Sequence, residues 1–154
     1  MHSLYDCNDY NYELLIIMKA FEHLSYYNIK PSVQRLAIME YLMDHRTHPT
    51  VDEIYSNLNV TMPTLSRTTI YNTLRLFSEQ GAAQMLTIDE KMTCYDADVS
   101  PHAHFLCKRC GGVFDLPLKE AQKESDERGF GGHSVTEIHY YYKGICKDCL
   151  KNID

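Results

Sequence analysis

In the first eighty residues, apolar side chains recur every three or four positions, the spacing of one face of an α-helix. The pattern predicts a helix over residues 12–26 and a second helix that opens at Ser32, its expected N-cap. Thr50 and Glu53 fit a capping box at the start of a short third helix. A fourth helix is predicted over residues 66–80. The expected apolar face of the first helix is Leu14, Ile17, Met18, Phe21 and Leu24.

Gly81 is expected just past the end of the fourth helix, as its C′ residue. The stretch that follows, AAQMLTIDEKMTCYDA, alternates apolar and polar residues around Asp89–Lys91, which predicts a hairpin. Helices followed directly by a hairpin are typical of a winged helix-turn-helix, in which the last helix enters the DNA major groove and the hairpin is the wing. The predicted fold class is therefore α+β, with a winged-helix DNA-binding domain over residues 1–97.

Two stripes run along the fourth predicted helix. Ile70, Leu74 and Phe77 form an apolar stripe that is expected to pack, which leaves a second, polar stripe free for phosphate and base-edge contacts. An ordinary solvated helix face is the alternative, but Glu79 is the only acidic residue between Asn59 and Ile88, which favours DNA. The predicted DNA-binding residues are Arg67, Thr68, Thr69, Tyr71, Asn72 and Arg75.

The composition changes at Asp98–Pro101, where a hinge is predicted. Residues 98–154 are expected to form a small α/β domain. Its expected elements are short strands at 104–107 and 113–116 joined by a Cys-Gly-Gly turn, a polar helix at about 118–128, and a β-branched and aromatic strand over 134–146.

Composition narrows the class of protein. A hydrophobic content of 44% supports a packed core. The sequence has no run of about eighteen apolar residues and no basic signal-like N-terminus, so a cytoplasmic protein without a membrane partner is expected. The net charge of −6 argues against nonspecific coating of nucleic acid. Residues 1–98 hold seven Lys or Arg against thirteen Asp or Glu, so DNA binding there requires a local patch.

Four of the six cysteines form two Cys-x-x-Cys pairs, Cys107 with Cys110 and Cys146 with Cys149. In a reducing compartment such pairs indicate metal or redox chemistry rather than disulfides. Each pair sets two thiolates on a tight turn, the geometry of two corners of a zinc tetrahedron. A thioredoxin-like redox pair lacks its fold pattern here, and unliganded buried thiols are the other alternative. The spacing favours a structural zinc site.

His102 and His104 are two positions apart, so both imidazoles face one side of an extended segment. Four thiolates already complete a zinc tetrahedron, so these histidines would serve a second metal. Asp96, Asp115 and His48 are further candidates, and nitrogen with carboxylate oxygen suits Fe(II), Mn(II) or Zn(II). From composition alone, two ordinary polar histidines are the alternative.

Several ordered motifs together resemble the ferric uptake regulator (Fur) family over nearly the full chain. They are THPT (47–50), SRTTIYNTLRLF (66–77), CYD (94–96), HAHFLCKRCG (102–111), VFD (113–115) and GICKDC (144–149). The resemblance implies a homodimer that binds operator DNA when a regulatory metal is present, with residues 98–154 as the metal-binding dimerisation domain. It also matches Tyr71 to a DNA-contacting tyrosine.

The resemblance further implies two metal sites. Structural Zn²⁺ falls on Cys107, Cys110, Cys146 and Cys149. Regulatory Fe²⁺ or Mn²⁺ falls on His48, Asp96, His102, His104 and Asp115.

Within the family, this ligand set is most similar to the peroxide-sensing branch, PerR. Zinc sensors commonly have a cysteine at the position of Asp96, and iron sensors often have glutamate at the position of Asp96, Asp115 or both. The resemblance implies repression that ends when iron catalyses the oxidation of a ligand histidine, with His48 and His102 as candidates. An iron-responsive or other metal-responsive (zinc, manganese) repressor is the alternative.

Two other classes of function compete. A non-haem iron oxygenase also uses two histidines and a carboxylate, but this chain is too short and too helical in its first half to add a substrate cavity, so no enzyme is expected. A zinc-stapled protein-interaction module without DNA binding is motivated by the acidic N-terminal half. Cys94 shares a strand face with Asp96 and is expected to be a small buried residue.

Overall fold

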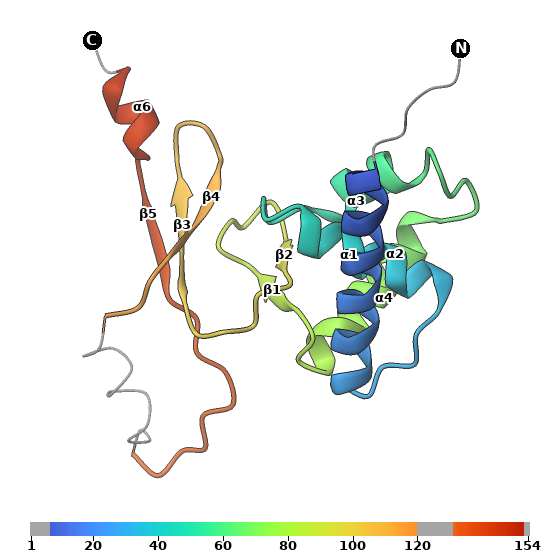
Figure 1. The fold of residues 1–154 in the computed structure, drawn as a ribbon. Helices are drawn as coiled ribbons and strands as arrows, with labels where there is room; N and C mark the ends of the chain where they lie inside the picture. The colour runs from blue at the N-terminus through green and yellow to red at the C-terminus, as the bar shows by residue number, and fades with distance from the viewer. Residues whose placement is uncertain (1–6, 120–130, 153–154) are drawn as a thin grey trace. The chain divides into compact units, whose positions relative to one another are not determined.

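The computed structural model describes residues 7–119 and 131–152. Contacts within the chain divide it into a first unit, Met1–Val99, and a second unit, Ser100–Asp154 (Figure 1). Within the described residues, no helix has both the length and the apolar character needed to cross a bilayer.

The described part of the first unit is a set of helices followed by a hairpin, in the predicted order of a winged helix-turn-helix. Its strands pair antiparallel, with Met85 opposite Tyr95. The elements are α1 (Cys7–Tyr26), α2 (Val33–Asp44), α3 (Val51–Leu58), α4 (Arg67–Glu79), β1 (Gln84–Leu86) and β2 (Cys94–Asp96).

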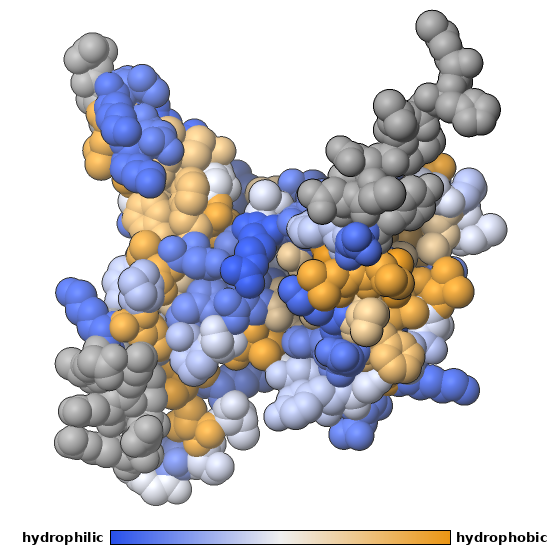
Figure 2. Space-filling view, viewed as in Figure 1, coloured by the Kyte–Doolittle hydropathy of each residue, from blue (hydrophilic) through white to orange (hydrophobic). Residues whose placement is uncertain are grey.

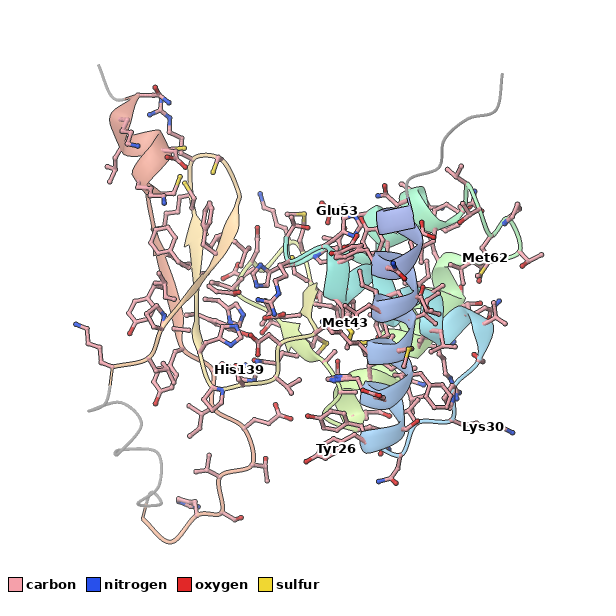
Figure 3. The ribbon with its side chains drawn as sticks, viewed as in Figure 1. Tyr26, Lys30, Met43, Glu53, Met62 and His139 are labelled. Carbon is pink, nitrogen blue, oxygen red and sulfur yellow. The ribbon has the colours of Figure 1, made fainter. Side chains whose placement is uncertain are left out.

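The helix ends follow the local signals in the sequence. The Ser32 side chain accepts a hydrogen bond from the Arg35 backbone N–H, as expected of an N-cap. Thr50 and Glu53 form the predicted capping box, in which a Glu53 carboxylate oxygen accepts from the Thr50 N–H at 2.6 Å (Figure 3). Gly81 follows α4 with φ +79°, a left-handed conformation that glycine adopts readily.

The core of the first unit lies among its helices and includes the predicted apolar stripe of α4. Ile70, Leu74 and Phe77 are all fully buried there. The predicted apolar face of α1 was largely wrong, because only Leu24 of its five residues is buried, together with Ala20, which was not predicted. The run LLIIM is apolar on all sides, so periodicity could not select the face that packs. The exposed residues of that prediction are Leu14, Ile17, Met18 and Phe21, which lie in an orange region over α1 in Figure 2.

The second unit contains a three-stranded sheet in the order β4-β3-β5. Strand β3 (Ala103–Cys107) pairs antiparallel with β4 (Val113–Leu116) and parallel with β5 (Tyr141–Gly144). The short helix α6 (Lys147–Lys151), which no sequence pattern predicted, follows.

Two predictions for the second unit need comment. The predicted strand over 134–146 is confined to 141–144, because β3 offers only a short edge for parallel pairing. The predicted helix at about 118–128 lies mostly outside the described residues.

Candidate functional site

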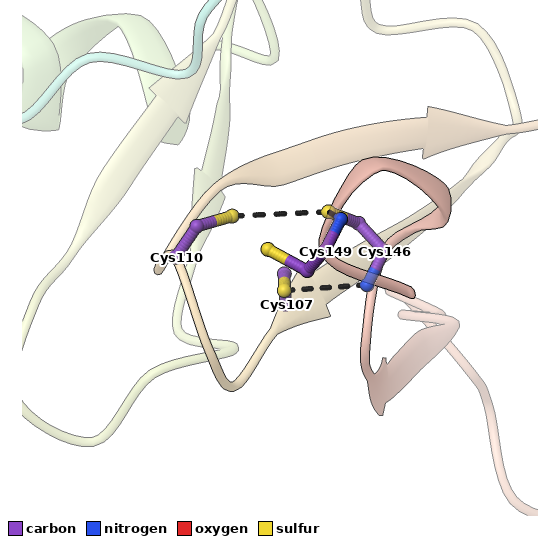
Figure 4. A group of neighbouring side chains, drawn as sticks. All are labelled: Cys107, Cys110, Cys146 and Cys149. Carbon is purple, nitrogen blue, oxygen red and sulfur yellow. Dashed lines mark hydrogen bonds between the residues drawn. The ribbon is translucent and has the colours of Figure 1, made fainter. Parts of the chain in front are cut away.

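The four cysteines of the two Cys-x-x-Cys pairs lie together in the second unit, with their sulfur atoms within 4.8 Å of one another (Figure 4). Cys107 ends β3 and Cys146 caps α6. Parallel pairing of Cys107 with Gly144 brings the two turns together, and the Lys108 N–H donates to the Gly144 carbonyl at 2.7 Å. The chain path, rather than either motif alone, therefore assembles the group.

Backbone N–H groups point at these sulfur atoms. The Cys146 N–H donates to Cys107 Sγ at 3.3 Å, and the Cys149 N–H donates to Cys146 Sγ at 3.4 Å. N–H groups of Cys110 and then Cys146 lower the pKa of Cys107 to about 6, because they stabilise its thiolate. Hydrogen bonding to Cys146, followed by burial, raises the pKa of Cys149 to about 12. Four sulfur donors around one point, one of them readily ionised, fit structural Zn²⁺.

A second group of donors lies in the same unit on β3, β4 and the segment before β3. The Nε2 atoms of His102 and His104 are 3.0 Å apart. Asp115 places one carboxylate oxygen 3.3 Å from His102 Nε2 and 3.6 Å from His104 Nε2. The register explains this, because His104 lies opposite Asp115 in the antiparallel pair. The triad combines nitrogen and carboxylate oxygen without a thiol, which suits Fe²⁺ or Mn²⁺.

The first unit holds its own buried histidine–carboxylate pair. His48 Nε2 lies 3.5 Å from an Asp96 carboxylate oxygen, and both residues are more than nine-tenths buried. The segment before α3 runs along β2. The Tyr95 N–H donates to the Pro49 carbonyl at 3.1 Å, and Thr50 forms an isolated antiparallel β-bridge with Cys94. The five predicted regulatory residues therefore occur as two groups, a pair in the first unit and a triad in the second.

Cys94 lies two residues before Asp96 and is buried, as the sequence predicted. Burial, followed by the charges of Glu53 and Asp89, raises the pKa of its thiol. A thiol held in its neutral form is a poor metal ligand, and Cys94 belongs to neither donor group.

The polar stripe of α4 lies at the surface of the first unit. Tyr71 is 52% exposed, and Thr68, Asn72 and Arg75 are exposed beside it. Thr69 is half-buried, and its backbone N–H donates to the N-cap Ser66. The stripe is thus available for contact with a partner.

A groove of about 410 Å³ runs between the start of α2 and this stripe. It is lined by Lys30 and Arg35 on one side and by Thr69 and Asn72 on the other. Sequence reasoning missed the two cations, because they lie far from α4 in the chain and only the packing of α2 on α4 brings them there.

Arg67 differs from the rest of the stripe. Its Nε donates to an Asp52 carboxylate oxygen at 2.6 Å, and its guanidinium carbon lies 3.9 Å from the Tyr55 ring centroid. The hydrogen bond to Asp52 raises the pKa of the guanidinium. Both partners belong to α3, so the sequence pattern of α4 gave no sign of them.

A winged helix-turn-helix unit joined to a small α/β unit, with one four-thiol group and histidine–carboxylate groups, defines a metal-binding winged-helix protein. The sequence model described as the ferric uptake regulator family matches residues 27–142. The chain therefore belongs to the ferric uptake regulator family.

Relatives within this family are informative. The chain is 34% identical over 122 residues to the peroxide-responsive repressor PerR of Staphylococcus aureus, which covers 79% of this chain and 82% of that protein. The Campylobacter jejuni peroxide stress regulator is similar in structure, with a TM-score of 0.63, 28% identity, and coverage of 88% of this chain and 98% of that one. The Helicobacter pylori ferric uptake regulator Fur shares the fold, with a TM-score of 0.68 at 18% identity over 92% of this chain and 96% of that one.

Proposed function

We propose that this chain is a metal-dependent transcriptional repressor that binds operator DNA as a homodimer and releases it when peroxide oxidises a ligand histidine. The observation that carries the proposal is the donor set, three histidines and two aspartates divided between the two units with no thiolate among them. Similarity to peroxide-responsive relatives supports the same branch.

In this proposal, one regulatory ion is bound by both groups of donors. His48 and Asp96 move with the DNA-binding unit, whereas His102, His104 and Asp115 belong to the other unit. An ion held by all five fixes one orientation of the DNA-binding unit. In a dimer, that orientation sets the spacing of the two recognition helices, which is the quantity an operator reads.

Metal binding and DNA binding are thermodynamically coupled in this proposal. Metal must tighten DNA binding by the same factor by which DNA tightens metal binding. Converting a mostly open population to a mostly closed one requires a preference of about 10⁴ for the closed form. Removing the pair of the first unit should abolish this coupling and leave weaker metal binding by the triad.

The chemistry of sensing follows from the ligands. His48, Asp96, His102, His104 and Asp115 would hold Fe²⁺, which when bound would supply the redox chemistry that activates hydrogen peroxide toward a neighbouring imidazole. In the net reaction, one oxygen atom is added to an imidazole ring carbon and the peroxide is reduced to water. His48 and His102 are the proposed targets, and the oxidised ring is a poorer ligand. The two units then lose their fixed orientation, and DNA is released.

DNA binding in this proposal uses the exposed stripe of α4 and the cations of the neighbouring groove. Tyr71, Asn72 and Arg75 are suited to base edges and phosphates, and Lys30 and Arg35 add positive charge beside them. Such a patch is the local positive charge that DNA binding by the acidic first unit would require. Exposed apolar side chains of the second unit support dimerisation there, namely Phe114, Leu116 and Tyr142.

The test begins with protein purified without oxygen and loaded with Fe²⁺ or Mn²⁺. Binding to a duplex that the Mn²⁺-loaded protein selects from a random library is measured before and after a small dose of peroxide. Peptides containing His48 and His102 are then weighed by mass spectrometry. The proposal expects only the iron form to lose DNA, with about one oxygen mass gained on one of these peptides.

The peptide containing His139 is the internal control. His139 also lies beside a carboxylate, 3.3 Å from Glu137, but outside the proposed donor set (Figure 3). Equal oxidation of this peptide would indicate nonspecific damage and contradict the proposal. If peroxide leaves both forms bound while iron removal releases DNA, the protein is an iron-responsive regulator instead.

A further inference from the structure

Arg67 lies at the first position of α4, on the exposed stripe proposed to meet DNA, yet its guanidinium is engaged within the protein. Asp52 and Tyr55 are three residues apart on α3 and therefore share one face of that helix. The carboxylate binds Arg67 Nε at 2.6 Å, and the Tyr55 ring lies 3.9 Å from the guanidinium carbon. Together the two side chains form a two-point cradle for Arg67.

This cradle uses properties that are specific to arginine. The guanidinium is planar, so its edge can donate to a carboxylate while its face lies over an aromatic ring. A lysine ammonium carries the same charge but has no plane to place on the ring and no Nε to donate. The geometry of the guanidinium, and not its charge alone, therefore favours arginine over lysine at position 67.

The cradle joins α3 to the start of α4, next to the turn that connects the two helices of the helix-turn-helix. The turn between α3 and α4 holds its own contacts, since the Leu65 N–H donates to the Met62 carbonyl at 3.0 Å. Arg67, the first residue of α4, adds side-chain contacts across that turn to Asp52 and Tyr55.

We propose that Arg67 is a positioning residue of the recognition helix, which fixes the N-terminus of α4 on α3 through Asp52 and Tyr55 and does not itself bind DNA phosphate. This inference rests on the proposed function, because it assigns a role within DNA binding. It replaces the sequence-based expectation that Arg67 is a direct contact.

The test compares Arg67→Lys with Arg75→Lys in the full-length, Mn²⁺-loaded protein, using the duplex that the wild type selects from a random library. Arg75 is the matched control, because it lies two turns further along the same stripe with only a 3.8 Å pairing to Glu79. We expect Arg67→Lys to weaken binding by about fivefold and Arg75→Lys, which keeps the positive charge at a proposed phosphate contact, to weaken it by less than about twofold. A phosphate contact at position 67 would instead tolerate lysine.

Salt dependence gives a second readout that distinguishes the two roles. Each phosphate contact contributes about 0.9 to the slope of log affinity against log salt concentration. Arg67→Gln should therefore weaken binding with an unchanged slope, whereas Arg75→Gln should reduce the slope by about one contact. A reduced slope for Arg67→Gln overturns the proposal.

Asp52→Asn supplies the reciprocal variant. If Arg67 positions α4, Asp52→Asn should weaken DNA binding. The double variant Asp52→Asn, Arg67→Lys should then bind DNA no more weakly than either single variant, because all three lose the same contact between residues 52 and 67. A direct phosphate contact predicts the opposite sign, since the freed arginine would bind more tightly. Stronger binding by Asp52→Asn therefore overturns the proposal.

Failure of the proposed function is separable from failure of this inference. If the wild type selects no sequence with Mn²⁺ loaded, the repressor function fails. The NMR resonance of the Arg67 Nε–H in the DNA-free protein still reports on the cradle, and it should shift in Asp52→Asn. An unshifted resonance shows that the link is absent in solution and overturns the positioning role directly.

Discussion

Removal of the four-thiol metal site should unfold the second unit and leave the first unit folded. Cys107→Ser is the sharpest perturbation, because this side chain is fully buried and its sulfur accepts the backbone N–H that links β3 to the start of α6. Serine keeps the size of the side chain but is a poor zinc ligand. The change therefore targets metal binding rather than packing.

The magnitude follows from how little apolar surface the described part of the second unit buries. Apart from the ligands Cys107 and Cys146, only Ala103 and Leu106 are buried apolar residues there. Full burial of a leucine side chain contributes about 2 kcal/mol. Structural zinc supplies about 10–16 kcal/mol to small domains. The described part of the first unit, in contrast, has a core of fourteen buried residues, so we expect it to stay folded without zinc.

Hydrogen exchange measured by mass spectrometry resolves the two units. In Cys107→Ser, amides of 103–107 and 141–144 should exchange at nearly the rate of an unfolded chain, while those of 67–79 keep their protection. Cys94→Ser is the matched control, because Cys94 is also buried but lies outside the four-thiol group. It should retain both zinc and protection in the second unit. Full protection of 103–107 in zinc-free protein would falsify this reasoning.

Four further outcomes are expected. Thr50→Ala should cost about 1 kcal/mol in chemical unfolding because the capping box is lost, and Thr50→Ser should restore it. Gly81→Ala should also cost about 1 kcal/mol because φ is +79°, and an unchanged unfolding midpoint contradicts that strain. Phe77→Ala should cost about 3–5 kcal/mol in the same assay, since the ring is fully buried, and a cost below about 1 kcal/mol refutes its core role. Because the pKa of Cys107 is about 6 in the metal-free protein, its thiol carries a proton below that pH and none above it. Calorimetry in buffers of different ionisation enthalpy should therefore find about one more proton released on zinc binding below about pH 5 than above about pH 7.

Short-range signals in the sequence were sufficient for the elements of the first unit. The N-cap at Ser32, the capping box at Thr50 and Glu53, and the left-handed Gly81 were predicted correctly, because each depends on a hydrogen bond or a dihedral angle within a few residues. The buried stripe of α4 was predicted for the same reason. The types of metal ligand could also be predicted, because Cys-x-x-Cys pairs and a His-x-His motif can be recognised in the sequence without knowledge of the fold.

The tertiary structure decided which of these residues meet. Parallel pairing of β3 with β5 brings the two cysteine pairs together, and the path of the chain along β2 places His48 beside Asp96. The spacing of apolar residues likewise did not predict the buried face of α1 or the contacts of Arg67 with Asp52 and Tyr55. The physical reason is that periodicity reports the direction of a side chain relative to its own helix or strand, whereas contacts between distant segments depend on how those elements pack.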